Sequence, residues 1–165
     1  MKPSEELRFI KRCNRITNKI RKSYPTLKYA GITFEIKKLK IGSMFARWTS
    51  KNAYKVQIDY SKYRLATNEE IAGALAHEFI HFEEYSTWTL AKRRRWLAKY
   101  LKSPLLRAKT ERRVDKKTIE RGFGKALAAN RSMRASDMTK EEILKAKRFY
   151  MFRDEIAKYA KRIGK

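Results

Sequence analysis

The sequence predicts an α+β fold in which a small three-stranded sheet packs against helices, and three observations lead to this prediction. Apolar residues recur at helical spacing in the first 24 residues, alternate with polar residues over 32–58, and return to helical spacing after residue 67. Two capping boxes mark the starts of later helices. The chain has 165 residues, 42% of them hydrophobic, which is enough to fill one core.

A first helix and three strands are expected before residue 60. The helix should begin at Ser4, an N-cap followed by two glutamates, and end at the Tyr-Pro break at residues 24–25. Strands are expected over 32–36, 44–49 and 54–58, where apolar and polar side chains alternate. Their succession along the chain indicates a small meander.

The next predicted helix carries the sequence HEFIH at residues 77–81. It begins at a capping box formed by Thr67 and Glu70 and runs to about residue 85. Gly73 costs a helix about 1 kcal/mol relative to alanine. Because alanines surround it, we expect this glycine to mark close packing against the sheet.

Helices are expected over the rest of the chain. One spans about 90–102 and the next about 105–121, up to a Gly-Phe-Gly interruption. A second capping box at Thr139 begins a last helix. Its apolar residues are spaced for one buried stripe: Ile143, Phe149, Phe152, Ile156 and Ile163.

The composition favours a soluble, basic protein. Lys and Arg total 42 against 17 Asp and Glu, a formal net charge of +25. This excess points to an anionic partner such as nucleic acid or, alternatively, to a thermophile surface. A single cysteine, Cys13, excludes an internal disulfide and a cysteine-based zinc knuckle. With no secretory h-region and no apolar stretch of about 18 residues, we expect a cytoplasmic protein that does not contact membranes.

The HEFIH sequence has the spacing of a metal site. On a helix, His77 and His81 lie one turn apart on the same face, so both imidazoles can reach one zinc ion. Glu78 lies beside them and can take a proton from a water that the metal holds. The alternative is a chance spacing of two ordinary histidines, but these are the only two in the chain.

A catalytic zinc needs a third protein ligand. Cys13 lies on a distant helix, and Glu83 and Glu84 are too close along the histidine helix to converge on the same ion. Glu111, one turn before Asp115 on a later helix, is therefore the predicted third ligand. Asp115 would then accept a hydrogen bond from a ligand histidine and fix its tautomer.

HExxH followed about thirty residues later by ExxxD resembles the gluzincin zinc metallopeptidases. The chain is most similar to the soluble minigluzincins and to the catalytic core of the CAAX-type prenyl-protein peptidases, over about residues 4–121. The resemblance implies a zinc metalloendopeptidase with one Zn²⁺ held by His77, His81 and Glu111. Glu78 would activate a zinc-bound water to hydrolyse a peptide bond.

The resemblance also implies how a substrate binds. A peptide or protein substrate would lie antiparallel along an exposed edge strand above the zinc, in contact with Met44, Phe45 and Ala46. Residues 1–125 would form the minimal catalytic domain, and 126–165 a helical extension packed on it. The chain lacks the membrane helices of the membrane relatives, so no membrane-embedded substrate is implied, and the oligomeric state stays open.

Two features of the implied enzyme are left open. With no spare histidine, a tyrosine or arginine must stabilise the oxyanion, and Tyr85, Arg148 and Tyr150 are the candidates. The segment 139–165 is a candidate inhibitory tail over the cleft. In that case, truncation before Asp137 is expected to raise activity.

A different class of function is a nucleic-acid-binding protein on an inactive or incidental gluzincin scaffold. Residues 65–91 carry five Glu and no Lys or Arg, whereas 88–117 carry twelve Lys or Arg. A phosphate backbone would be attracted to the second region. Trp88, Trp96 and Tyr100 could stack on bases there, although at helical spacing they also suit a core.

Overall fold

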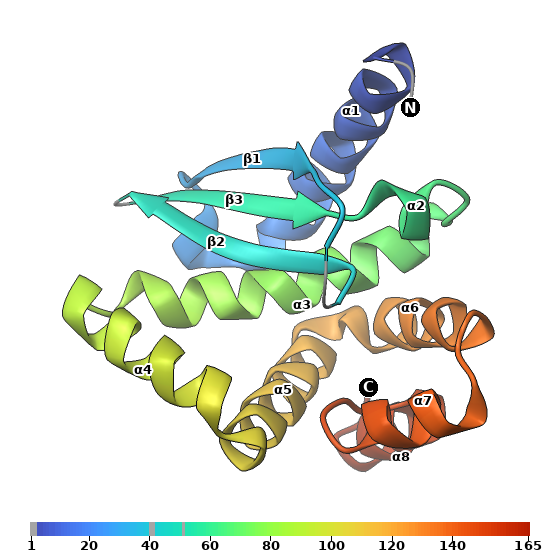
Figure 1. The fold of residues 1–165 in the computed structure, drawn as a ribbon. Coiled ribbons are helices and arrows are strands. Elements are labelled where there is room, and N and C mark those ends of the chain that lie inside the picture. The colour runs from blue at the N-terminus through green and yellow to red at the C-terminus, as the bar shows by residue number, and fades with distance from the viewer. Residues whose placement is uncertain (1–2, 40–41, 51) are drawn as a thin grey trace.

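Helix α3 (Asn68–Ser86) lies at the centre of the molecule. The computed structural model describes residues 3–39, 42–50 and 52–165. The sheet covers one side of α3, and the helices that follow α3 lie on the other side (Figure 1). Helix α1 (Pro3–Ile20) packs against α3 and the sheet. The predicted α+β class is confirmed, and among the described residues no helix is long and apolar enough to span a bilayer.

The sheet consists of β1 (Gly31–Ile36), β2 (Met44–Ser50) and β3 (Ala53–Ile58). Its order is β1-β3-β2, with β3 parallel to β1 and antiparallel to β2. The predicted meander is therefore wrong, because the third strand and not the second is central. Alternation reveals the two faces of a strand but not its neighbours. The central strand is also the most buried, with Val56 and Ile58 fully enclosed.

The other helices follow the predicted segments with local differences, apart from those at 60–63 and 124–136, for which no separate helix was predicted. Helix α1 ends before the predicted break, and two 3₁₀ turns at Arg21–Ser23 and Pro25–Leu27 follow it. A short helix, α2 (Tyr60–Tyr63), follows β3. The later helices are α4 (Leu90–Lys102), α5 (Pro104–Thr118), α6 (Gly124–Ser136), α7 (Lys140–Lys147) and α8 (Arg153–Arg162).

A π-helical turn at Ile119–Phe123 joins α5 to α6. Gly122 in this turn has φ of 90°, a backbone conformation that residues with a side chain rarely adopt. The predicted interruption at the Gly-Phe-Gly sequence is therefore confirmed, and it lets the chain change direction between two helices.

The single last helix predicted from the second capping box is wrong, because the structure has two helices, α7 and α8. Between them, the Met151 N–H donates to Asp115 Oδ2 at 2.8 Å and the Phe152 N–H to Glu155 Oε2 at 3.3 Å. These donors bond to carboxylates instead of to helical carbonyls, which breaks the helix. Met151 and Ile156 then pack into a second, smaller core.

Gly73 does mark a close contact, but with α6 and not with the sheet as predicted. A Cβ placed on Gly73 would lie 2.1 Å from the carbonyl oxygen of Ala126. Helices α3 and α6 therefore approach each other backbone to backbone. The division between 1–125 and 126–165 stays a prediction, although α6 belongs to the packing around α3.

Candidate metal centre

The HEFIH residues lie in the middle of α3, turned into the molecule. The predicted capping box starts the helix: Glu70 N–H donates to Thr67 Oγ1 at 3.2 Å, and Thr67 N–H donates to Glu70 Oε2 at 2.6 Å. His77, Glu78 and His81 are only 4%, 9% and 6% exposed. One helix thus holds two imidazoles and a carboxylate in the interior.

Glu111 of α5 completes a cluster of three metal-binding side chains with His77 and His81. One ligand atom of each residue lies within 4.8 Å of the others. His77 Nε2 is 3.1 Å from Glu111 Oε2, and His81 Nε2 is 3.7 Å from Glu111 Oε1. All three side chains are buried, and together they offer two nitrogens and an oxygen. They could hold a metal ion.

Asp115 lies behind His77, as the sequence predicts. Its Oδ1 is 2.8 Å from His77 Nδ1 and accepts a hydrogen bond from Arg131 at 2.7 Å. Its Oδ2 accepts the Met151 N–H at 2.8 Å. The carboxylate is fully buried and its position is fixed from three elements, so it can orient the His77 ring.

Burial and local charge divide the acidic groups of the cluster into two kinds. Burial opposes the ionised forms of Glu111 and Asp115, but His81 and Arg131, respectively, outweigh it and lower the pKa of each carboxyl. Burial raises the pKa of Glu78 above its ordinary value. Glu78 is therefore the carboxylate that most readily accepts a proton.

His77 is held between two carboxylates. Burial lowers its pKa, but hydrogen bonds to Asp115 and Glu111 outweigh burial and raise the pKa to about 10. The two carboxylates thus favour the protonated, positively charged form of the ring. A cation bound at Nε2 would take the place of the proton on that nitrogen.

The edge strand β2 lies against Glu78. Its Ala46 N–H donates to Glu78 Oε2 at 2.9 Å, and β2 pairs only with β3 among the described strands. The unpaired edge of β2 therefore faces the HEFIH residues. Met44 and Ala46 are buried there, and Phe45 is 42% exposed. All three predicted substrate-binding residues line the same cavity as Glu78.

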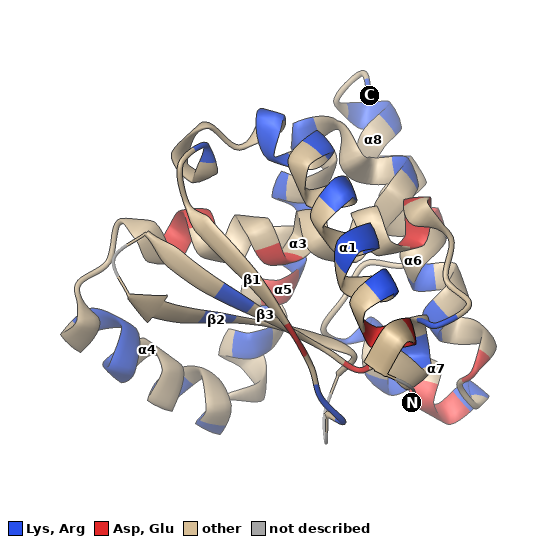
Figure 2. Ribbon diagram, turned by 90° about the horizontal axis from the view of Figure 1, so that it is seen from above, with Lys and Arg blue, Asp and Glu red and all other residues tan. Residues whose placement is uncertain are grey.

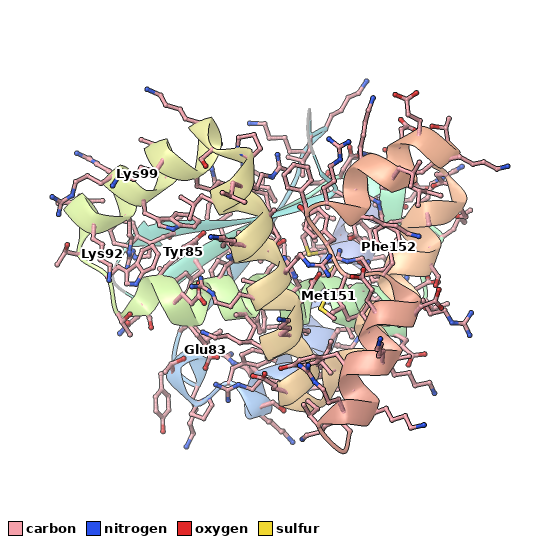
Figure 3. All side chains as sticks on the ribbon, turned by 90° about the horizontal axis from the view of Figure 1, so that it is seen from below. Glu83, Tyr85, Lys92, Lys99, Met151 and Phe152 are labelled. Carbon is pink, nitrogen blue, oxygen red and sulfur yellow. The ribbon has the colours of Figure 1, made fainter. Side chains whose placement is uncertain are left out.

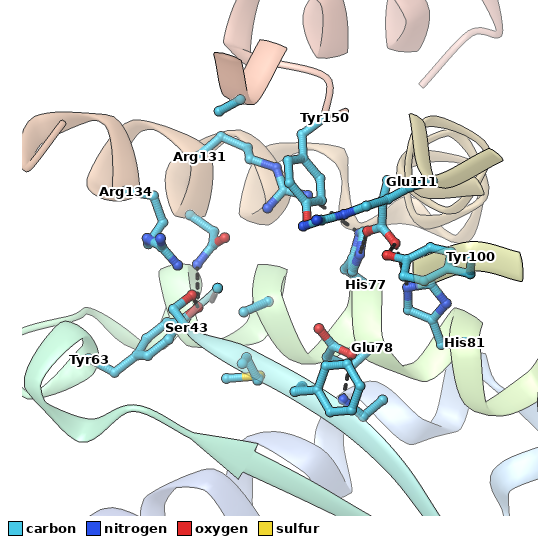
Figure 4. Close-up of a pocket in the computed structure, with 18 of the residues that line it drawn as sticks. Ser43, Tyr63, His77, Glu78, His81, Tyr100, Glu111, Arg131, Arg134 and Tyr150 are labelled. Atoms are coloured by element: carbon cyan, nitrogen blue, oxygen red, sulfur yellow. Dashed lines mark hydrogen bonds and ion pairs between the residues drawn. The ribbon is translucent and has the colours of Figure 1, made fainter. Parts of the chain in front are cut away.

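This cavity has a volume of about 260 Å³ and extends over the cluster of His77, His81 and Glu111 (Figure 4). Its walls come mainly from β2, α3, α4, α5, α6 and the segment that joins α7 to α8. The lining is mainly apolar and aromatic. Apolar and aromatic side chains that contribute to it include Leu97, Leu101, Met138, Tyr150 and Phe152.

The predicted oxyanion donors lie at different places. Tyr85 stacks on His81 with ring centroids 5.8 Å apart, and the Tyr150 ring lies 6.1 Å from that of His77. Arg148 is not among the described residues that line the cavity. The two glutamates excluded as ligands form ion pairs elsewhere, Glu83 with Arg121 and Glu84 with Arg113 and Lys117.

Three residues of the site were not predicted from the sequence. Tyr100 of α4 donates a hydrogen bond to Glu111 Oε1, Arg131 of α6 holds Asp115, and Arg107 of α5 lines the cavity. No local pattern distinguishes these arginines from the many others in a basic chain. The only signal for Tyr100 was its helical spacing from Trp96, which indicated an inward-facing position.

The outer side of α4 is strongly basic. The helix has no Asp or Glu and several Lys and Arg (Figure 2), and Lys92 and Lys99 extend into solvent (Figure 3). Its aromatic residues instead contact other rings: Trp96 stacks on Tyr100 with centroids 4.7 Å apart, and Trp88, just before the helix, meets Trp96 edge-on at 5.4 Å. The exposed cations are Lys92, Arg94, Arg95, Lys99 and Lys102.

Comparisons of the chain with protein-family models, curated proteins and solved structures found no match. The group that could hold a metal ion contains buried ligand atoms at short range, a carboxylate behind one histidine, and a second carboxylate beside an open strand edge.

Proposed function

We propose that the protein is a zinc-dependent metalloendopeptidase of the gluzincin type. The observation that carries this proposal is the position of Glu78. It lies next to the ligand histidines on α3 and is hydrogen-bonded to the backbone of Ala46 on the open edge of β2. A proton-accepting carboxylate therefore lies where a peptide along β2 would meet the metal centre.

The donor set fits zinc. Two imidazoles and one carboxylate are a common ligand set of catalytic zinc, which keeps a fourth position free. Here His77, His81 and Glu111 would hold the ion, and all three are buried. When bound, zinc acts as a Lewis acid that polarises a carbonyl and lowers the pKa of water.

The residues of the chain have separate tasks in this hydrolysis. Ala46 holds Oε2 of Glu78, which leaves Oε1 to take a proton from the attacking water and pass it to the leaving amide nitrogen. Asp115 keeps His77 in the tautomer whose Nε2 faces the centre. Tyr150 and Arg107 line the cavity beside Glu111 and are the proposed donors to the oxyanion.

The open edge of β2 supports peptide binding by strand addition. Backbone groups of alternate residues point to the same side of a strand. Because the Ala46 N–H points to Glu78, the backbone groups of Met44 and Trp48 also point away from β3. A substrate that runs antiparallel to β2 can pair with them.

The decisive experiment compares the full-length protein with its Glu78→Gln variant. Metal content is measured by mass spectrometry, and hydrolysis is followed with casein. We expect one zinc per chain in both proteins, and a rate at least about a hundredfold lower in the variant. Glu69→Gln, on the exposed first turn of the same helix, is the control and should keep its activity. Absence of metal from carefully prepared protein, or activity of the Glu78→Gln variant, would refute the proposal.

A second candidate function is binding to nucleic acid or another polyanion, and the acid-free outer face of α4 favours it. We expect replacement of Arg94, Arg95 and Lys99 by Gln to weaken DNA binding and to reduce its dependence on salt. Binding is measured by fluorescence anisotropy between 50 and about 200 mM salt. Tight, salt-dependent binding without hydrolysis would favour this function over the peptidase.

A further inference from the structure

Two arginines of α6 line the cavity, and only one of them has a partner. Arg131 and Arg134 lie one turn apart on the helix. Arg131 is neutralised by Asp115 at 2.7 Å. Arg134 makes no hydrogen bond or ion pair with another described residue.

The chain has no carboxylate left in the cavity to neutralise Arg134. Glu78 accepts from Ala46, and Glu111 lies between the two histidines and Tyr100. The residues outside the described ranges include no Asp or Glu. A partly buried guanidinium without an internal partner favours an anion from outside. The anion that matches a guanidinium best in a peptide is a carboxylate.

A polar chain next to Arg134 ends in a hydroxyl that can donate to a ligand. Figure 4 shows Arg134, Ser43 and Tyr63 at one end of the cavity and the histidines at the other. Asn130 Nδ2 donates to Tyr63 Oη at 3.3 Å, and Tyr63 Oη lies 3.2 Å from Ser43 Oγ. Because the Asn130 amide occupies an acceptor site of Tyr63, the Tyr63 hydroxyl can donate to Ser43. The Ser43 hydrogen is then free for a ligand.

The direction of β2 sets which part of a substrate reaches this end. Ser43 immediately precedes β2, whereas Ala46 lies opposite Glu78. A peptide antiparallel to β2 therefore passes Glu78 first and approaches Ser43 with the residues that follow the scissile bond.

We propose that Arg134 and Ser43 form a subsite for a substrate carboxylate on the C-terminal side of the scissile bond. This subsite rests on the proposed peptidase function. The carboxylate can belong to an acidic side chain or to the C-terminus of the peptide, since both present the same pair of oxygens to the guanidinium. The enzyme would thus prefer peptides with an acidic group after the bond that it cleaves.

The test uses peptides that differ at one position. Asp or Asn is placed on either side of a cleavable bond, and each peptide is made with a free and with an amidated C-terminus. The value of kcat/KM is measured for the zinc-loaded wild-type protein and for Arg134→Gln, Arg134→Glu and Lys125→Gln. Lys125→Gln removes the same charge from α6 at a side chain that is 92% exposed. Binding of the same peptides to Glu78→Gln, with and without Arg134→Gln, is measured by fluorescence anisotropy.

We expect Asp after the bond, or a free C-terminus, to raise kcat/KM at least about tenfold over the uncharged peptide. The preference should disappear in Arg134→Gln, reverse in favour of Asn over Asp in Arg134→Glu and persist in Lys125→Gln. The side-chain and terminal sources are distinguished by the amidated peptides. A preference that survives Arg134→Gln, or one for Asp before the bond, would overturn the subsite.

Failure of the subsite and failure of the peptidase give different results. Cleavage of all peptides at equal rates would leave the peptidase standing and refute the subsite. If no peptide is cleaved but carboxylate-dependent binding is lost with Arg134, the binding site stands and the reaction fails. If no peptide is cleaved and binding depends on neither the carboxylate nor Arg134, both proposals fail.

Discussion

Nδ1 of His77 lies 2.8 Å from Oδ1 of Asp115, so one nitrogen of the imidazole is engaged behind the ring while Nε2 faces Glu111. This contact joins α3 to α5 through two buried side chains. Because Arg131 and the Met151 N–H also bind Asp115, three elements determine the direction of the ring. The direction of the His77 ring therefore depends on residues far along the chain from HEFIH.

Asp115→Asn should weaken metal binding while leaving all three ligands in place. An amide can still contact His77, but it no longer stabilises the donor proton of Nδ1 or balances Arg131. We expect zinc affinity to fall about 10- to 100-fold, measured by competition with a chromophoric chelator. Asp137→Asn, at an exposed position, is the control. Equal affinity in both variants would show that the contact has no role in ligand orientation.

Tyr150→Phe tests the oxyanion donor. The variant keeps the ring that stacks over Arg131 at 4.5 Å and removes only the hydroxyl. If this hydroxyl stabilises the oxyanion, kcat should fall about 100-fold or more with little change in KM. Tyr159→Phe on α8, whose hydroxyl bonds to Glu120, should behave as wild type. An unchanged kcat in Tyr150→Phe would leave Arg107 as the donor to test.

Gly73→Ala should destabilise the fold although alanine is the better helix former. The new methyl group would lie 2.1 Å from Ala126 O, 2.4 Å from Ala126 C and 2.8 Å from Leu127 N, all backbone atoms that cannot rotate away. We expect a loss of about 3 kcal/mol in the free energy of unfolding, measured in urea. Gly31→Ala, whose nearest neighbours would be 3.9 Å away, should change it by less than about 0.5 kcal/mol.

Cys13 should resist thiol reagents in the folded protein. Burial raises its pKa to about 12, only partly offset by Arg12, and the side chain has no exposed surface. Because the thiolate is the reactive form, roughly one thiol in ten thousand is ionised at pH 8. We expect no reaction with Ellman's reagent until denaturant is added, and then one thiol per chain. Rapid labelling of the native protein would contradict the packing of α1.

The proximity of His77, His81 and Glu111 could be predicted because chemistry restricted the choices. With two histidines in the chain, a third ligand had to be a carboxylate downstream, and Glu111 with Asp115 had the right spacing. No such chemical requirement pointed to Arg131. It reaches Asp115 only because α6 packs on α3 at Gly73, a contact between distant segments that periodicity does not reveal.

The strand order is a second feature that the sequence pattern does not reveal. Alternation identified β1, β2 and β3, but the partner of a strand depends on the path of the connections. Similarly, the apolar spacing after Thr139 suits one helix, and the break at Met151 arises because a buried Asp115 accepts its N–H. The helices and strands follow from local sequence here, whereas their neighbours depend on contacts between distant segments, such as that of the Met151 N–H with Asp115.

Truncation before Asp137 is the sharpest test of the C-terminal segment. A gain in activity was predicted from the sequence, but the packing favours a loss. The cut removes Tyr150 from the cavity and Met151 N–H from Asp115, and it exposes Ile119 and Leu127, which are fully buried. We expect a lower Tm and at least about a tenfold lower kcat/KM.

Phe152→Ala tests whether the C-terminal segment blocks the cleft or only supports the fold. It opens the cavity wall but keeps α8 and the Met151 contact. If the segment only supports the site, this variant should keep a kcat/KM within a few-fold of wild type while the truncated protein loses activity. If the segment blocks the cleft, Phe152→Ala should raise kcat/KM with little change in Tm. A truncated protein with wild-type Tm and higher activity would establish that the segment inhibits the enzyme. It would also show that Tyr150 is not needed for the reaction.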